Sequence, residues 1–65
     1  MKPNLWEIVR REDGTFDIIH KGELSRRAIT DRWLEDELCQ YGFCGEEYKD
    51  IRRKLDQSGR ATIAL

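Results

Sequence analysis

The sequence predicts a single small α+β domain of order β-β-α-α-β, in which a helical hairpin covers one face of a three-stranded sheet. Three observations lead to this fold class: a hairpin pattern over residues 5–20, two stretches of helical periodicity within residues 24–59, and an alternating segment at 60–65. A chain of 65 residues has room for only one hydrophobic core. We therefore expect residues 1–65 to form one compact domain.

Charged residues are abundant and balanced. Hydrophobic and charged residues each make up 38% of the chain, and 12 basic against 13 acidic residues leave a formal net charge of −1. The apolar positions recur with regular periods, which favours a folded domain over a disordered one. A nearly neutral chain has no general attraction for nucleic acid or membrane. No apolar run reaches the length of a membrane span or a signal-peptide core, so we expect a cytoplasmic protein.

Residues 5–11 and 15–20 form the predicted hairpin around Glu12-Asp13-Gly14. A two-residue Asp13-Gly14 turn would mix apolar and charged side chains on one face. A three-residue loop with Gly14 in the left-handed conformation instead aligns the large apolar side chains, and we predict that loop. The side chains expected to face inward are Trp6, Ile8, Phe16 and Ile18.

The opposite face of the hairpin carries three apolar side chains among polar ones, Leu5, Val9 and Ile19. Scattered apolar residues are ordinary on a solvated sheet face. The same three residues are also a candidate partner or dimer face, although a small one. Free sheet edges are a further candidate, because an edge strand can pair with another chain, and Pro3 and Lys21 would protect such edges only in part.

The first helix is predicted to follow the connection 21–23. Ser25 suits an N-cap, and Leu24 before it can pack against Ile29 as a hydrophobic staple. The helix is expected to run to about residue 41 and to end at Gly42. Glu37 falls within the apolar side, so we expect it at the rim or paired with a cation. That apolar side comprises Ile29, Trp33, Leu34, Leu38 and Tyr41.

The second helix repeats this entry pattern. Cys44 is placed at its N-cap, and Phe43 before it can pack against Tyr48. The helix is expected to end at Ser58-Gly59. Its apolar stripe comprises Tyr48, Ile51 and Leu55.

Residues 60–65 alternate as a strand with Ala61, Ile63 and Leu65 inward. Two helices of similar length return the chain to the end of the sheet that it left. We therefore expect this last strand to run parallel to the first and antiparallel to the second. It can pair with either strand, and we favour the first because Trp6 and Ile8 make it the better-buried centre.

Four basic residues, Lys49, Arg52, Arg53 and Arg60, are candidate nucleic-acid contacts. DNA readers of the helix-turn-helix class also join two helices by a short turn. Glu46 and Glu47 count against this use, because they place negative charge where a reading helix approaches phosphates. Acidic residues interleaved with the basic ones favour an ordinary charged helix face.

Cys39, Cys44 and His20 are the only cysteines and the only histidine. Three potential ligands are too few for a structural zinc site, and the cysteine spacing is not C-x-x-C. We expect both thiols to be reduced in the cytoplasm. A helix N-terminus can activate a thiol, so Cys44 is a candidate reactive cysteine, but a buried or capping role is the simpler interpretation.

No nucleophile, base and acid fall into a catalytic pattern, and we expect neither an enzyme nor a cofactor or metal site. The features favour a protein-protein interaction or accessory module, whose partner is an unknown protein or a second copy of the chain. The alternative is a nucleic-acid-binding regulator that uses the basic side of the second helix. A thiol redox switch at Cys44 is a third hypothesis.

Overall fold

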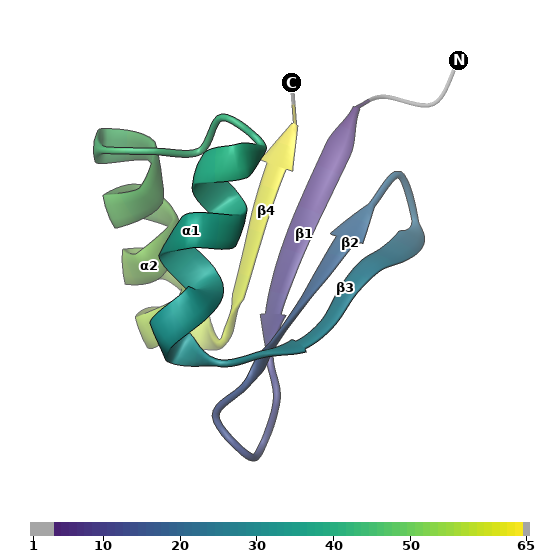
Figure 1. Ribbon diagram of the computed structural model, residues 1–65, viewed down its shortest axis with the longest axis vertical. Coiled ribbons are helices and arrows are strands. Elements are labelled where there is room, and N and C mark those ends of the chain that lie inside the picture. The colour runs from purple at the N-terminus through teal and green to yellow at the C-terminus, as the bar shows by residue number, and fades with distance from the viewer. Residues whose placement is uncertain (1–3, 65) are drawn as a thin grey trace.

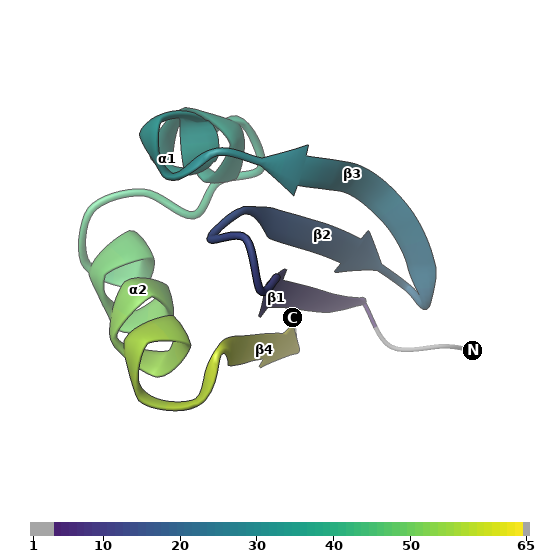
Figure 2. The same cartoon turned by 90° about the horizontal axis from the view of Figure 1, so that it is seen from below.

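The computed structural model describes residues 4–64, which form a four-stranded antiparallel sheet with two helices on one face (Figures 1 and 2). The elements are β1 (Leu5–Arg10), β2 (Phe16–His20), β3 (Glu23–Ile29), α1 (Asp31–Gln40), α2 (Glu46–Ser58) and β4 (Arg60–Ala64). The strands lie in the order β3-β2-β1-β4. The α+β class is thus confirmed, but the sheet has four strands rather than the predicted three.

The β1–β2 hairpin has the predicted loop. The N–H of Arg11 donates to the carbonyl oxygen of Thr15 at 2.7 Å, so the loop between them has three residues. Gly14 has a φ of 88°, the left-handed conformation that this loop requires. The resulting register buries the four predicted side chains, Trp6, Ile8, Phe16 and Ile18.

The segment predicted to begin the first helix is instead strand β3, which pairs antiparallel with β2. Lys21 and Gly22 connect the two strands, and both have positive φ, 55° and 81°, as in a type I′ hairpin turn. The pairing satisfies backbone groups of β2 that a helix would have left at a free edge. This gain in backbone pairing explains why the segment is extended.

The helix prediction for Ser25 and Leu24 is therefore wrong. Leu24 lies in β3 with 55% of its surface exposed, and it makes no staple with Ile29, which is buried at the far end of the same strand. Thr30 takes the N-cap position, and the helix begins with Asp31, whose negative charge suits the positive end of a helix.

Strand β4 pairs with β1, as favoured, but the two strands are antiparallel rather than parallel. The extra strand β3 reverses the chain once more before the helices begin. The helical pair therefore starts and finishes at the end of the sheet opposite to the predicted one (Figure 1). The predicted orientation failed because it counted one strand too few.

The core lies between the sheet and the two helices. Leu34 and Leu38 are buried on α1, and Ile51 and Leu55 are buried on α2. Trp33 was predicted to face this core but is 56% exposed, because the buried positions of α1 point in another direction. Of the two alternatives for Glu37, a position at the rim or pairing with a cation, the structure shows the pairing, with Nε of Arg26 in β3 3.2 Å from the carboxylate.

The turn between the helices differs from the prediction by one residue. Gly42, with a φ of 94°, follows the end of α1 as predicted, but the N-cap of α2 is Gly45 and not Cys44. Phe43 is buried, and Gly59 ends α2 in the left-handed conformation. The predictions for Pro3 and Leu65 fall outside the residues that the structure describes.

Candidate functional site

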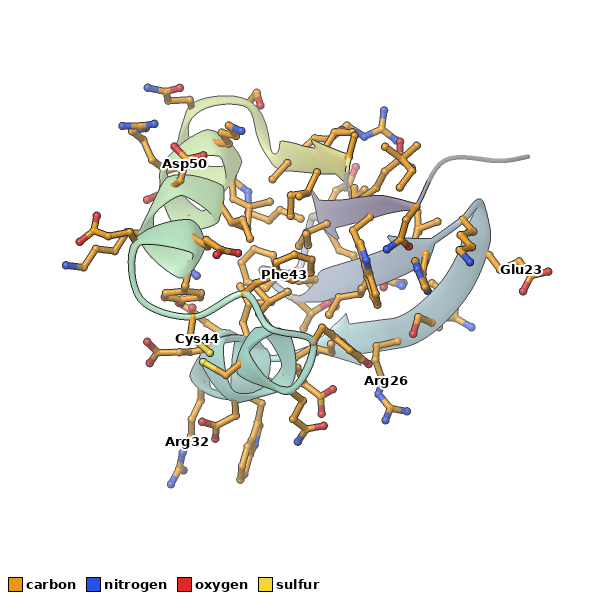
Figure 3. All side chains as sticks on the ribbon, turned by 90° about the horizontal axis from the view of Figure 1, so that it is seen from above. Glu23, Arg26, Arg32, Phe43, Cys44 and Asp50 are labelled. Carbon is orange, nitrogen blue, oxygen red and sulfur yellow. The ribbon has the colours of Figure 1, made fainter. Side chains whose placement is uncertain are left out.

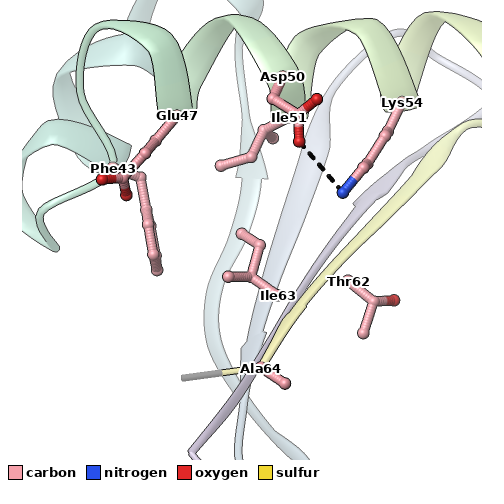
Figure 4. Close-up of a pocket in the computed structure, with 8 residues that line it drawn as sticks. All are labelled: Phe43, Glu47, Asp50, Ile51, Lys54, Thr62, Ile63 and Ala64. Atoms are coloured by element: carbon pink, nitrogen blue, oxygen red, sulfur yellow. Dashed lines mark ion pairs between the residues drawn. The ribbon is translucent and has the colours of Figure 1, made fainter.

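An open groove with a volume of about 280 Å³ lies between α2 and β4 (Figure 4). Ile51 of α2 and Ile63 of β4 point toward one another across it, and Phe43 stands at one end beside Glu47. The floor is therefore apolar and the helical rim is charged. The lining residues are Phe43, Glu47, Asp50, Ile51, Lys54, Thr62, Ile63 and Ala64.

Strand β4 is an edge of the described sheet, with β1 on one side. The N–H of Arg10 donates to the carbonyl oxygen of Gly59 at 2.8 Å. This bond determines which residues of β4 direct their N–H and C=O groups toward β1. Backbone groups alternate in direction along an antiparallel strand. Ala61 and Ile63 therefore direct their backbone groups to β1, whereas Thr62 and Ala64 direct theirs away from the sheet.

The contacts of Ser58 agree with this assignment. Its hydroxyl lies 3.1 Å from the carbonyl oxygens of both Lys54 and Arg60, so the Arg60 carbonyl faces the end of α2. Thr62 and Ala64 follow Arg60 at every second residue, so their backbone groups point to the same side of the strand. Their outward N–H and C=O groups run beside the groove.

The predicted partner face, Leu5, Val9 and Ile19, lies on the side of the sheet away from the helices, and all three side chains are half-buried. Glu7 lies directly opposite Ile19, between the other two, so a carboxylate interrupts the apolar surface. Leu24 of β3 pairs with Ile19 and extends this surface, a contribution that the sequence analysis missed because it placed Leu24 in a helix.

The structure pairs three of the four predicted nucleic-acid contacts with carboxylates. Lys49 lies 3.6 Å from Glu46, Arg52 joins Asp31 and Asp56, and Arg53 joins Asp50. The hydrogen bond from Arg52 to Asp31 raises the pKa of this guanidinium above its usual value and links α2 to α1. Arg60 lies apart from them, exposed on β4.

The two cysteines lie together at the turn between the helices, and both thiols are free. The Sγ of Cys44 is 3.6 Å from the carbonyl oxygen of Cys39 and donates to it. The neighbouring Cys44 thiol, aided by desolvation, raises the pKa of Cys39 to about 11. A thiol with a raised pKa is a poor nucleophile at neutral pH, so Cys39 is not an activated cysteine.

His20 takes part in an aromatic cluster. Its ring stacks on Trp6 with centroids 3.6 Å apart, and its Nε2 hydrogen-bonds the side-chain oxygen of Asn4 at 2.6 Å. Tyr41 and Phe43 pack on the same indole. Among residues 4–64, no three His, Cys, Asp or Glu side chains are placed to hold a metal ion. Neither α1 nor α2 is long and apolar enough to span a membrane.

Comparison with known proteins found no match to a family model, to a curated protein or to a solved structure. The function must therefore be inferred from the fold and its surfaces. The groove itself was missed from the sequence, since it depends on the direction of β4. Its one sequence signal is the small, uncharged Thr62 and Ala64 in a strand that was expected at an edge.

Proposed function

We propose that this protein is a protein-interaction module that binds an extended segment of a partner chain along the outer edge of β4. The observation that supports this function is the coincidence of outward backbone groups at Thr62 and Ala64 with the groove beside α2. In strand addition, main-chain hydrogen bonds provide affinity, and pockets for alternate side chains provide specificity. The β4 edge offers both components.

The chemistry of the groove indicates which segment would fit. Its floor, formed by Ile51 and Ile63, suits an apolar side chain, and Glu47 on the rim suits a basic one. Its volume of about 280 Å³ is at the lower limit of small-molecule sites, about 300 Å³, and it is open along one side. Side chains of a strand therefore fit it better than an enclosed small ligand.

The nucleic-acid alternative has weaker support. Lys49, Arg52 and Arg53 would have to exchange carboxylate partners for phosphates, and each neighbouring carboxylate would repel the nucleic acid. An interaction through β4 requires no such exchange. We therefore base the proposal on the edge strand.

Selection of a random peptide library on the immobilised full chain tests the proposal. Enriched peptides are expected to contain an extended apolar segment and to protect the Thr62 and Ala64 amides from hydrogen exchange, as measured by NMR. Thr62→Pro removes one outward N–H without touching the β1 ladder, and it should weaken peptide binding by at least about tenfold. Leu24→Lys on the opposite edge strand is the matched control and should bind the peptides normally.

Two results would refute strand addition at β4. One is a library without enriched peptides from a chain that also shows no self-association through β4. The other is a set of peptides whose protection pattern maps to β3 or to the open sheet face, with Thr62→Pro binding them as the unmodified chain does.

A further inference from the structure

We infer that a second copy of this chain occupies the β4 edge, through antiparallel β4–β4 pairing across a twofold axis at Thr62. This inference rests on the proposed function and names its partner. It joins two four-stranded sheets into one continuous sheet with all four helices on the same face.

The alternating direction of the backbone N–H and C=O groups along β4 permits this pairing. Arg60, Thr62 and Ala64 all direct their backbone groups outward, as derived from the bond between Arg10 and Gly59. An axis at Thr62 places it opposite Thr62 of the second copy, and places Arg60 opposite Ala64 of that copy. Every outward position of the strand then faces another outward position, so each such pair can exchange two hydrogen bonds.

The side chains are compatible with the same register. On the open face, Arg60 lies beside the small Ala64 of the second copy, and the two arginines stand at opposite ends of the strand pair. Like charges opposite one another would be unfavourable, and this register avoids them. On the helix face, the small Ala61 lies opposite the larger Ile63 of the second copy.

The charges on α2 are complementary across the same axis. Asp50 and Lys54 lie one helical turn apart on the groove side of α2, and their charged groups are 3.2 Å apart (Figure 4). Figure 3 shows Asp50 on the outer surface of α2, away from α1. A twofold axis makes the two α2 helices antiparallel, so Asp50 of one copy approaches Lys54 of the other.

The assembly closes at two chains. An isologous contact uses the same surface of both copies, so no β4 edge remains free. The remaining edges belong to β3, whose register is irregular and whose side chains include Glu23, Arg26 and Arg27. Bulges and charges of this kind discourage further pairing.

Sedimentation over about 10 µM to about 1 mM tests the assembly. The mass should rise from the 7.7 kDa of one chain toward twice that value. Asp50→Lys and Lys54→Asp should each weaken association by at least about tenfold, and the double exchange should restore it. A monomer throughout this range, or a double exchange that fails to restore association, would overturn the inference.

Cross-linking locates the contact. In a chain with Cys39→Ser and Cys44→Ser, Thr62→Cys should form a disulfide-linked dimer on mild oxidation, because directly opposite Cα atoms are about 5.5 Å apart. Leu24→Cys in the same background is the control and should not cross-link. A dimer linked through Leu24→Cys and not through Thr62→Cys would overturn this arrangement.

The two proposals fail separately. A monomeric chain that still binds library peptides at Thr62 overturns the second-copy inference alone. Loss of both peptide binding and self-association refutes the proposed function with it.

Discussion

The two edges of the sheet expose their backbones very differently. Strand β3 pairs irregularly with β2, with register shifts on both sides of Ile18. It carries the charged residues Glu23, Arg26 and Arg27, and Figure 3 shows the first two of these side chains on its outer side. Strand β4 pairs with β1 in an uninterrupted register, and its outer positions beyond Arg60 are the uncharged Thr62 and Ala64. One edge is irregular and charged, and the other is regular and adjoins a groove.

This difference supports the proposal that β4, rather than β3, is the binding edge. Bulges and charges are the usual means by which proteins prevent unwanted pairing of an exposed edge. Their concentration on β3 and near-absence on the described part of β4 is the pattern expected of a chain that protects one edge and uses the other.

The largest effect is expected from proline on β4. Ile63→Pro removes an N–H that bonds β1 and leaves its acceptor unpaired, so it should destabilise the fold by about 1–3 kcal/mol from this loss alone. Thr62→Pro, one residue earlier, removes an outward N–H and should cost about 1 kcal/mol or less. Denaturant unfolding of both variants measures the difference. Equal losses would show that the assigned direction of the β4 backbone groups is wrong.

Asp17 holds the irregular part of the β3 edge. Its Oδ1 accepts the N–H of Ala28 at 2.9 Å, and Arg11 donates to the same carboxylate at 3.3 Å. Asp17→Ala should therefore cost about 1–2 kcal/mol in denaturant unfolding. A cost below the error of the measurement would mean that this bond does not stabilise the edge.

The same carboxylate makes stability depend on pH. Chiefly the Ala28 N–H, with Arg11 in support, lowers the pKa of Asp17 below its ordinary 3.8. A lowered pKa in the folded state stabilises the protein above about pH 4, and this contribution is lost as pH falls through the folded value. Asp17→Asn, which cannot ionise, should lose less stability between pH 5 and pH 3, pH values chosen to bracket the ordinary carboxyl range. An identical acid loss in both proteins would contradict this role.

The predictable parts of the fold were those with a burial pattern. The hairpin loop followed from the one register that aligned Trp6 and Ile8 with Phe16, and the stripe on α2 followed from Ile51 and Leu55. In each case, burial of large side chains distinguishes one arrangement from the others. Such burial is visible in the sequence as the regular spacing of apolar residues.

Strand β3 was not predictable in this way, because residues 21–28 are exposed. Backbone pairing with β2 forms this strand, and pairing leaves no apolar period in the sequence. Lys21 also occupies a turn position with a φ of 55° where asparagine, aspartate or glycine is the usual signal. The groove was not predicted either. The direction of β4 depends on the number of preceding strands, and the prediction omitted β3.

Glycine should have opposite effects on the two edges. Ala28 in β3 has a φ of 55°, a left-handed conformation that costs a residue with a Cβ roughly 1 kcal/mol. Ala28→Gly should relieve that strain and raise the unfolding free energy by up to about 1 kcal/mol. Ala64→Gly in the regular β4 should lower it by about 0.5 kcal/mol. Thermal and denaturant unfolding measure both, and two changes of the same sign would show that the edges do not differ in strain.

The smallest effect is expected from the ion pair that ties β3 to α1. Arg26 and Glu37 lie 3.2 Å apart, but 55% of the arginine side chain is exposed. Solvent screens such a pair, so Arg26→Ala should change the unfolding free energy by no more than about 0.5 kcal/mol, and a double-mutant cycle with Glu37→Ala should give a coupling of the same size. The irregular β2–β3 register remains in this variant, so its self-association should equal that of the unmodified chain. New association that Thr62→Pro does not abolish would show that charge, rather than the irregular register, protects the β3 edge.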